Sequence, residues 1–290
     1  MLPFLPLLVA ACDWDSQARA AATASVLDSL QAKGYTVTEG VQVVTHTTSF
    51  GANPGNPYLV YKFDTNNSGL DMPTFKLDAR DAILNIVCTP SNVSYFGWRS
   101  YLFAEPFPVF ASLGDTLNNL VINTTGGSGD ILNRTAAVVT TGDATAFDHV
   151  SAALADAGLA KATNLDGYAP SIVPHQSLSL FVMLHRASVW PDPVAKAAYF
   201  NQTNPIYLLS PPRAQAASPL PLLPLRPRGT GHREQDVPGL LDALSSLRAS
   251  VIARFVVLGG TLKAEDKTHS RALNGRDCIA QKKQCLGEDP

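Results

Sequence analysis

The sequence has little charge and no excess of either sign. Only 16% of its 290 residues are Asp, Glu, Lys or Arg, and 22 basic against 24 acidic residues give a formal net charge of −2. Without a basic field to collect phosphates, the chain is not expected to bind nucleic acid. Beyond the N-terminal segment no apolar run is long enough for a transmembrane helix, so we predict no integral membrane span.

The sequence also lacks the patterns that hold metals and nucleotides. Its six histidines are scattered, and none occurs in the H-E-x-x-H arrangement that places two imidazoles on one zinc ion. The glycine-rich segment 123–130 has no lysine where a phosphate-binding loop requires one. We therefore predict no metal and no cofactor.

What the sequence does contain predicts a globular chain of many short elements. Hydrophobic residues make up 46% of it, and 21 prolines and 20 glycines punctuate them. Apolar residues at helical spacing predict helices over 15–33 and 237–258. Segment 134–159 predicts a strand, a turn and a helix in succession. The fold class is α/β or α+β, a single mixed-sheet domain over residues 14–260 with flanking helices.

The C-terminal part is predicted to be extended and then closed by a disulfide. Four prolines keep segment 217–234 extended inside the domain. Residues 261–290 form a small tail, where Cys278 and Cys285 enclose a short polar segment. In an oxidising compartment these two cysteines are expected to pair, and a metal pair is the alternative. Cys88 is then unpaired.

The first twelve residues indicate the compartment. Residues 2–11 are apolar and uncharged, too short to span a bilayer but suited to the core of a signal peptide, here residues 1–12. No Lys or Arg precedes this run, and a buried N-terminal segment is the alternative. Residues 9–12, Val-Ala-Ala-Cys, also resemble a bacterial lipobox, which would anchor the chain through lipid on Cys12. We expect an extracellular or secretory-pathway protein.

Asn-x-Ser/Thr sequons support the secretory route. The sequence has five where chance predicts about two. A sequon marks an acceptor for N-linked glycosylation, so we predict a glycoprotein. The candidate sites are Asn66, Asn92, Asn123, Asn133 and Asn201.

The segment around residue 115 suggests a nucleophile. Gly114-Asp115-Thr116-Leu117 follows an apolar run and resembles block I of the GDSL esterase/lipase family, where a hydroxyl attacks an ester carbonyl. That family has a late Asp-x-x-His, and this sequence has Asp266 three residues before His269. The resemblance implies that Thr116 is the nucleophile and His269 the base oriented by Asp266. The same segment also fits a polar turn that Asp115 caps, with no chemistry.

Other residues suggest binding without catalysis. Trp98 and Tyr101, in an aromatic run, can stack on sugar rings, and Arg99 adds a planar set of donors. Arg226 and Arg228 in a basic loop can hold an anion. A core position for the rings and a solvated linker for the loop are the alternatives.

Two hypotheses for function follow, and the sequence does not decide whether the protein is an enzyme. It is either a secreted hydrolase acting on an ester or glycan, or a non-catalytic secreted protein that recognises a carbohydrate or a small anion. In both cases the predicted partner is a small molecule or carbohydrate.

Overall fold

The computed structural model describes residues 12–45, 57–63, 73–104, 108–173, 179–202, 204–224 and 239–257. The chain divides into two compact units, 1–227 and 228–290. Among the described residues, the first holds the sheet and its flanking helices, and the second holds helix α4 (Leu240–Val257). Within these described ranges, no helix combines the length and the apolar character that a membrane crossing needs.

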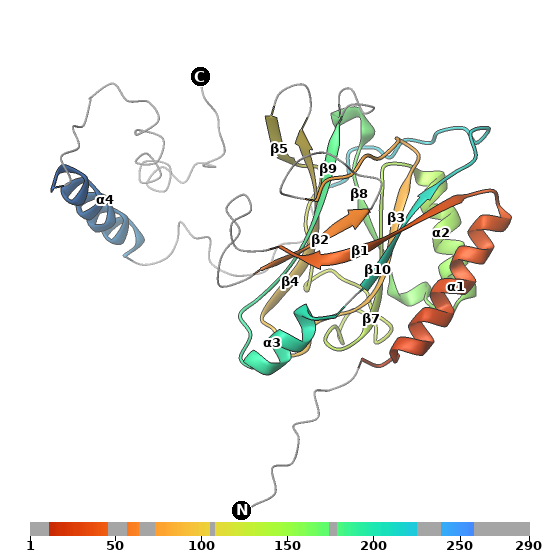
Figure 1. Cartoon of the computed structure of the whole chain (residues 1–290), viewed down its shortest axis with the longest axis horizontal. Coiled ribbons are helices and arrows are strands. Elements are labelled where there is room, and N and C mark those ends of the chain that lie inside the picture. The colour runs from red at the N-terminus through yellow and green to blue at the C-terminus, as the bar shows by residue number, and fades with distance from the viewer. Residues whose placement is uncertain are drawn as a thin grey trace, which may run out of the picture. The chain divides into compact units, whose positions relative to one another are not determined.

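The first unit is a mixed sheet with flanking helices (Figure 1). Its helices are α1 (Ser16–Ala32), α2 (Ala144–Asp156) and α3 (Pro193–Phe200). Its strands are β1 (Thr36–Val44), β2 (Tyr58–Phe63), β3 (Ala82–Cys88), β4 (Tyr95–Ala104), β5 (Pro108–Ser112), β6 (Leu117–Asn118), β7 (Thr135–Thr141), β8 (Thr163–Gly167), β9 (Leu180–Ser188) and β10 (Asn204–Ser210). The predicted fold class, a mixed sheet with helices packed against it, is confirmed.

The strands lie in the order β5-β4-β9-β2-β1-β10-β3-β7-β8, and β6 pairs with β4. Every pairing is antiparallel except β7 with β8, which α2 connects as a β–α–β unit. The sheet curls until β4 and β8, near the two ends of this order, contact each other. The predicted strand, turn and helix over 134–159 correspond to β7 and α2.

The helices begin where short acidic side chains cap them. Asp15, Asp143 and Asp192 accept hydrogen bonds from backbone N–H groups in the first turns of α1, α2 and α3. Such a cap satisfies a donor that the helix itself leaves unpaired. These caps explain why the helices start where the sequence changes from polar to apolar-periodic.

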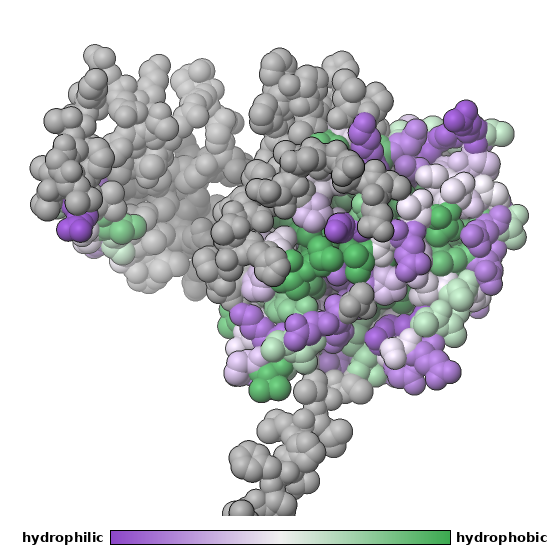
Figure 2. Space-filling view, viewed as in Figure 1, coloured by the Kyte–Doolittle hydropathy of each residue, from purple (hydrophilic) through white to green (hydrophobic). Residues whose placement is uncertain are grey.

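Two clusters of buried side chains pack on opposite sides of the sheet. The outer cluster joins α1 and α2 to strands β3, β7 and β10, and its members include Val26, Leu30, Leu84, Val139 and Val150. The inner cluster fills the curl, and its members include Phe63, Trp98, Phe181, Tyr199 and Phe200. Helices α1 and α2 thus cover part of the outer face. On the face seen in Figure 2, apolar residues gather over β1 and β2.

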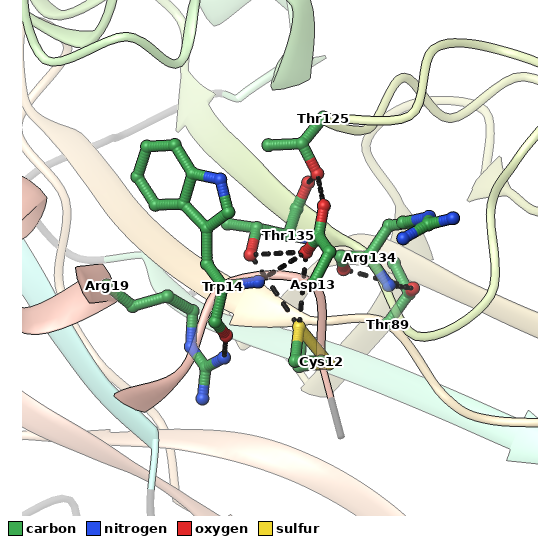
Figure 3. The surroundings of a disulfide bond; sticks show 9 residues. Cys12, Asp13, Trp14, Arg19, Thr89, Thr125, Arg134 and Thr135 are labelled. Atoms are coloured by element: carbon green, nitrogen blue, oxygen red, sulfur yellow. Dashed lines mark hydrogen bonds between the residues drawn. A yellow bond between two sulfur atoms is a disulfide. The ribbon is translucent and has the colours of Figure 1, made fainter. Parts of the chain in front are cut away.

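The structure corrects the predicted cysteine pairing. Cys12, just before α1, forms a disulfide with Cys88 at the end of β3 (Figure 3). The prediction that Cys88 is unpaired is therefore wrong. Because Cys12 belongs to the folded body, a leader ending at residue 12 would remove half of this bridge. The lipid-anchor alternative needs the same Cys12 sulfur, which the disulfide occupies.

The residues after Cys12 are fastened to the same region. The Asp13 carboxylate accepts hydrogen bonds from the backbone N–H of Thr135 at 2.8 Å and from the Thr125 hydroxyl (Figure 3). These bonds hold the pKa of Asp13 below its usual value, although burial alone would raise it. The predicted partners Cys278 and Cys285, with the tail 261–290, lie beyond the described residues.

Candidate functional site

The strands β4, β9 and β2 carry a cluster of arginine and tyrosine on their outer face. Strand alternation turns Phe96, Trp98 and Ser100 of β4 inward, so the residues between them face outward. The cluster, called here the arginine–tyrosine surface, consists of Tyr58, Tyr95, Arg99, Tyr101 and Arg186. All five side chains are half-buried, so each keeps part of its surface accessible.

Arg186 lies between two tyrosine rings. Its guanidinium carbon is 5.9 Å from the ring centre of Tyr58 and 6.0 Å from that of Tyr95. In the sheet, Arg186 of β9 pairs with Tyr58 of β2 on one side and with Gly97 of β4 on the other. A cation over a ring face within about 6 Å is attracted by the ring's quadrupole. Nε of Arg186 is buried and has no hydrogen-bond partner.

Arg99 is held by polar contacts from β5 and the turn that follows it. Its Nε donates to the Ser112 hydroxyl at 2.6 Å and to the Gly114 carbonyl at 3.3 Å. Its guanidinium carbon is 5.9 Å from the centre of the Tyr101 ring. The Nε of Arg99 is therefore held by Ser112 and Gly114, while the side chain as a whole stays half-buried.

Gly97 allows the turn at residue 116 to approach the surface. A Cβ at this glycine would lie 2.8 Å from Cγ2 of Thr116 and 3.2 Å from the hydroxyl of Tyr95. Both distances are shorter than ordinary van der Waals contact. Only glycine at this position lets the Thr116 side chain and the Tyr95 hydroxyl lie so near the backbone of β4, beside Arg186.

Tyr95 and Tyr101 stay neutral at physiological pH. Burial raises the pKa of Tyr95 and of Tyr101, and the positive charges of Arg99 and Arg186 only partly oppose it. The hydroxyls therefore keep their protons, and the surface carries the positive charge of its arginines. The ion pairs found among the described residues, Arg80 with Asp78 and Arg134 with Asp130, lie outside it.

The structure brings together four of the predicted site residues. Arg99, Tyr101, Asp115 and Thr116 all lie on or beside the arginine–tyrosine surface. Trp98 does not, because it is fully buried and its ring stacks on His185 with centroids 4.0 Å apart. It therefore offers no face to a ligand at the surface. The predicted residues Arg226, Arg228, Asp266 and His269 fall in segments that are not described.

The predicted turn over 114–117 corresponds to the short segment between β5 and β6, and Leu117 already belongs to β6. The Asp115 carboxylate accepts the backbone N–H of Thr116 at 3.0 Å, and β6 begins one residue later. A hydroxyl nucleophile needs an imidazole within hydrogen-bond reach. The histidines described by the structure are engaged elsewhere: His149 with the Tyr35 hydroxyl, and His185 with Gln42 on the inward face of β9.

A second polar cluster lies inside the curl. The Asp166 carboxyl of β8 accepts from the Ser100 hydroxyl of β4, and from the Thr140 hydroxyl of β7 at 3.1 Å. Nearby, the Asn85 amide donates to the Tyr61 hydroxyl at 2.9 Å. All five side chains are buried. No three of the described His, Cys, Asp and Glu residues come together as metal ligands would.

Sequence reasoning missed both Arg186 and Asp166. The segment that contains Arg186 is apolar and fits a strand as well as a helix, so the direction of its side chain was not predictable. Asp166 lies in a short segment without a clear period. The run of apolar residues at 180–184 hides any alternation, so only the pairing of β9 with β4 and β2 shows that Arg186 lies on the face opposite Phe181 and Met183.

The sequons differ in accessibility. The asparagines of three are exposed: Asn92, Asn123 and Asn201. Asn133 is half-buried, and Thr135, the hydroxyl residue of its sequon, is fully buried. Asn66 belongs to a segment that is not described. Glycosylation at these positions stays a prediction.

Comparison with protein-family models, with curated proteins and with solved structures found no match for this chain.

Proposed function

We propose that this is a non-catalytic secreted protein that recognises a carbohydrate or a small anion through the arginine–tyrosine surface. The observation that carries the proposal is Arg186, held between Tyr58 and Tyr95 beside a second fixed arginine, Arg99. Guanidinium groups donate in a planar fork that matches carboxylate, phosphate and sulfate oxygens. Tyrosine rings supply apolar faces and neutral donors for a sugar.

Pre-organisation supports binding at this place. An arginine loses rotamer freedom when it grips a ligand, and that loss lowers affinity. Here ring contacts and the bonds from Arg99 to Ser112 and Gly114 have already restricted the two side chains. Less ordering is then needed at the moment of binding. A partly accessible surface whose arginines are already held by neighbouring residues suits recognition of a ligand from solution.

The hydrolase hypothesis is the second candidate, because Thr116 packs beside the same surface. It requires Asp266 and His269 to reach Thr116, and both lie outside the residues that the structure describes. Secretion agrees with the Cys12–Cys88 disulfide, since such bonds persist in oxidising compartments.

Calorimetric titration of the purified protein tests the binding function. The probes are sodium sulfate, sodium phosphate and a panel of neutral and acidic oligosaccharides. We expect Arg186→Gln and Arg99→Gln each to weaken binding about tenfold, the scale of one lost hydrogen bond to a charged group.

Arg248→Gln is the matched control, because it removes the same charge from an exposed position on α4. It should leave the affinity unchanged. Circular dichroism confirms that each variant is folded. If no probe binds the wild-type protein, or if the three variants behave alike, the proposed function is wrong.

A further inference from the structure

The arginine–tyrosine surface presents two cationic positions rather than one. Arg186 pairs across the strands with Gly97, and Arg99 pairs with Leu184. The two arginines are thus diagonal neighbours on β4 and β9, a relation that sets residues about 7–8 Å apart in an antiparallel sheet. The surface therefore offers two donor groups side by side on a sheet.

Different residues make the main contacts of the two guanidinium groups. Arg186 lies against the rings of Tyr58 and Tyr95, whereas Nε of Arg99 donates to Ser112. Each arginine can therefore hold one negative group of a ligand that carries two such groups with a spacer between them.

We propose that the ligand is an acidic oligosaccharide that presents carboxylate or sulfate groups on successive rings, one for each arginine; this inference rests on the proposed binding function. The arginines contact the charged groups, and the spacer between these groups is the sugar ring itself. The ligand lies across β4, β9 and β2, the strands that carry the five residues.

The residues around the arginines match a sugar rather than an isolated anion. Tyr58, Tyr95 and Tyr101 are half-exposed and offer ring area to the C–H faces of a sugar. Burial keeps the hydroxyl of Tyr95 protonated, so it can donate a hydrogen bond to a sugar oxygen. The half-exposed Leu184 adds apolar area beside Arg99.

Other polyanions fit less well. A nucleic acid needs a basic field, whereas this chain has a net charge of −2. Free sulfate or phosphate satisfies one arginine and leaves the tyrosines unused. The proposal therefore predicts that affinity requires charge and successive sugar rings in the same molecule.

The test compares ligands that differ in one property at a time. The probes are tetragalacturonate, its fully methyl-esterified form, monomeric galacturonate, a heparin-derived tetrasaccharide, sodium sulfate and vesicles containing phosphatidylserine. Calorimetry at constant ionic strength gives each affinity, because salt screens exposed charges. We expect at least one acidic tetrasaccharide to bind at least tenfold more tightly than the monomer and sulfate, and the esterified form not to bind.

Variants locate the contacts. Arg99→Gln and Arg186→Gln should each weaken tetrasaccharide binding about tenfold and bring it close to that of the monomer. Arg186→Lys keeps the charge but loses the planar fork, so we expect an intermediate loss. Tyr58→Leu removes a ring that both supports Arg186 and offers a face to a sugar, so it should weaken binding of the tetrasaccharide more than binding of sulfate. Arg248→Gln should change neither.

The outcomes separate this inference from the function on which it rests. If sulfate or the monomer binds as tightly as both tetrasaccharides, and the arginine variants abolish that binding, anion recognition stands and the acidic oligosaccharide is wrong. Equal binding of the esterified form, or tighter binding of the vesicles, also overturns it. If no probe binds at all, both proposals fail.

Discussion

The inner and outer faces of β4 and β9 both carry polar side chains, but the two faces use them differently. Inside, the Asp166 carboxyl receives hydrogen bonds from Ser100 and Thr140, and all three groups are buried. Outside, Arg99 is held by Ser112 and Arg186 by the Tyr58 ring, and both side chains remain half-buried. The inner groups satisfy one another, whereas the outer groups keep surface for a ligand.

This difference assigns the faces to separate tasks. A buried polar group costs free energy unless it is paired, so the bonds from β4 and β7 to β8 are needed to close the curl. A half-buried arginine at a surface adds less to stability than a paired group inside, because water still solvates part of its charge in the folded chain. Substitutions inside should therefore change stability, and substitutions outside should change binding.

The largest effect is expected where the N-terminal segment joins the sheet, away from both faces. Replacing Cys12 and Cys88 together by serine removes a disulfide between residues 76 apart in sequence. The unfolded chain then gains the freedom of a long loop, which should lower the free energy of unfolding by about 4 kcal/mol. Urea unfolding measures this loss, and ligand affinity of the folded double variant should be unchanged. A loss of affinity would show that the outer surface depends on this bridge.

The next largest effect tests the inner face. Asp166→Ala leaves the hydroxyls of Ser100 and Thr140 without their shared acceptor in a buried site. We expect the free energy of unfolding to fall by about 3 kcal/mol, while Ser100→Ala, which removes one donor, should cost about 1 kcal/mol. Urea denaturation compares the two variants. Equal costs would show that losing the shared acceptor destabilises the fold no more than losing one donor, which would contradict the role of Asp166 as the acceptor for both hydroxyls.

A third effect concerns the dependence of stability on pH. Burial lowers the pKa of His185 to about 3, against an ordinary value of about 6.5. At pH values below 6.5 His185 is protonated in the unfolded chain but neutral in the folded chain. The free energy of unfolding therefore falls as the pH falls, until the pH reaches the pKa of the folded state. The slope should approach about 1 kcal/mol per pH unit between roughly pH 6 and pH 4.

His185→Gln provides the comparison for this acid effect. The difference in unfolding free energy between wild type and variant should shrink by about 2 kcal/mol across that range. A constant difference would show that His185 is protonated in the folded state. The pH dependence of ligand affinity serves as a check, since His185 lies on the face opposite the arginines.

The sequence predicted the parts of this fold that depend on local signals. The strand, turn and helix over 134–159 follow from apolar periodicity and the cap at Asp143. The helix over 237–258 was predicted for the same reason and is α4. The turn after β5 follows from the chemistry of Gly114 and Asp115.

The candidate site was predictable only in part, because it depends on contacts between distant strands. Arg99 and Tyr101 were predicted from their own segment, but Arg186 is 87 residues beyond Arg99 and joins it only through the pairing of β4 with β9. The Cys12–Cys88 bridge was missed because the apolar N-terminal run placed Cys12 in a leader. Trp98 was a candidate for stacking because composition does not reveal which face of a strand is buried.

The smallest effect decides what the turn beside the arginine–tyrosine surface does. Asp115→Ala removes the carboxylate that accepts the Thr116 N–H at 3.0 Å. If the turn is structural, this change should lower the free energy of unfolding by about 1 kcal/mol, the usual scale of a lost local cap.

Thr116→Ala completes this test, because it removes the hydroxyl but keeps the backbone that Asp115 binds. Under the structural interpretation, it should leave stability and any ester or glycoside turnover unchanged within error. Under the hydrolase hypothesis, Thr116→Ala and His269→Ala should each reduce turnover by orders of magnitude while the melting temperature stays constant. A panel of p-nitrophenyl esters and glycosides, measured on both variants and on Asp115→Ala, distinguishes the two. Turnover by the wild type that both variants abolish would assign chemistry to the outer face and would contradict its role in binding alone.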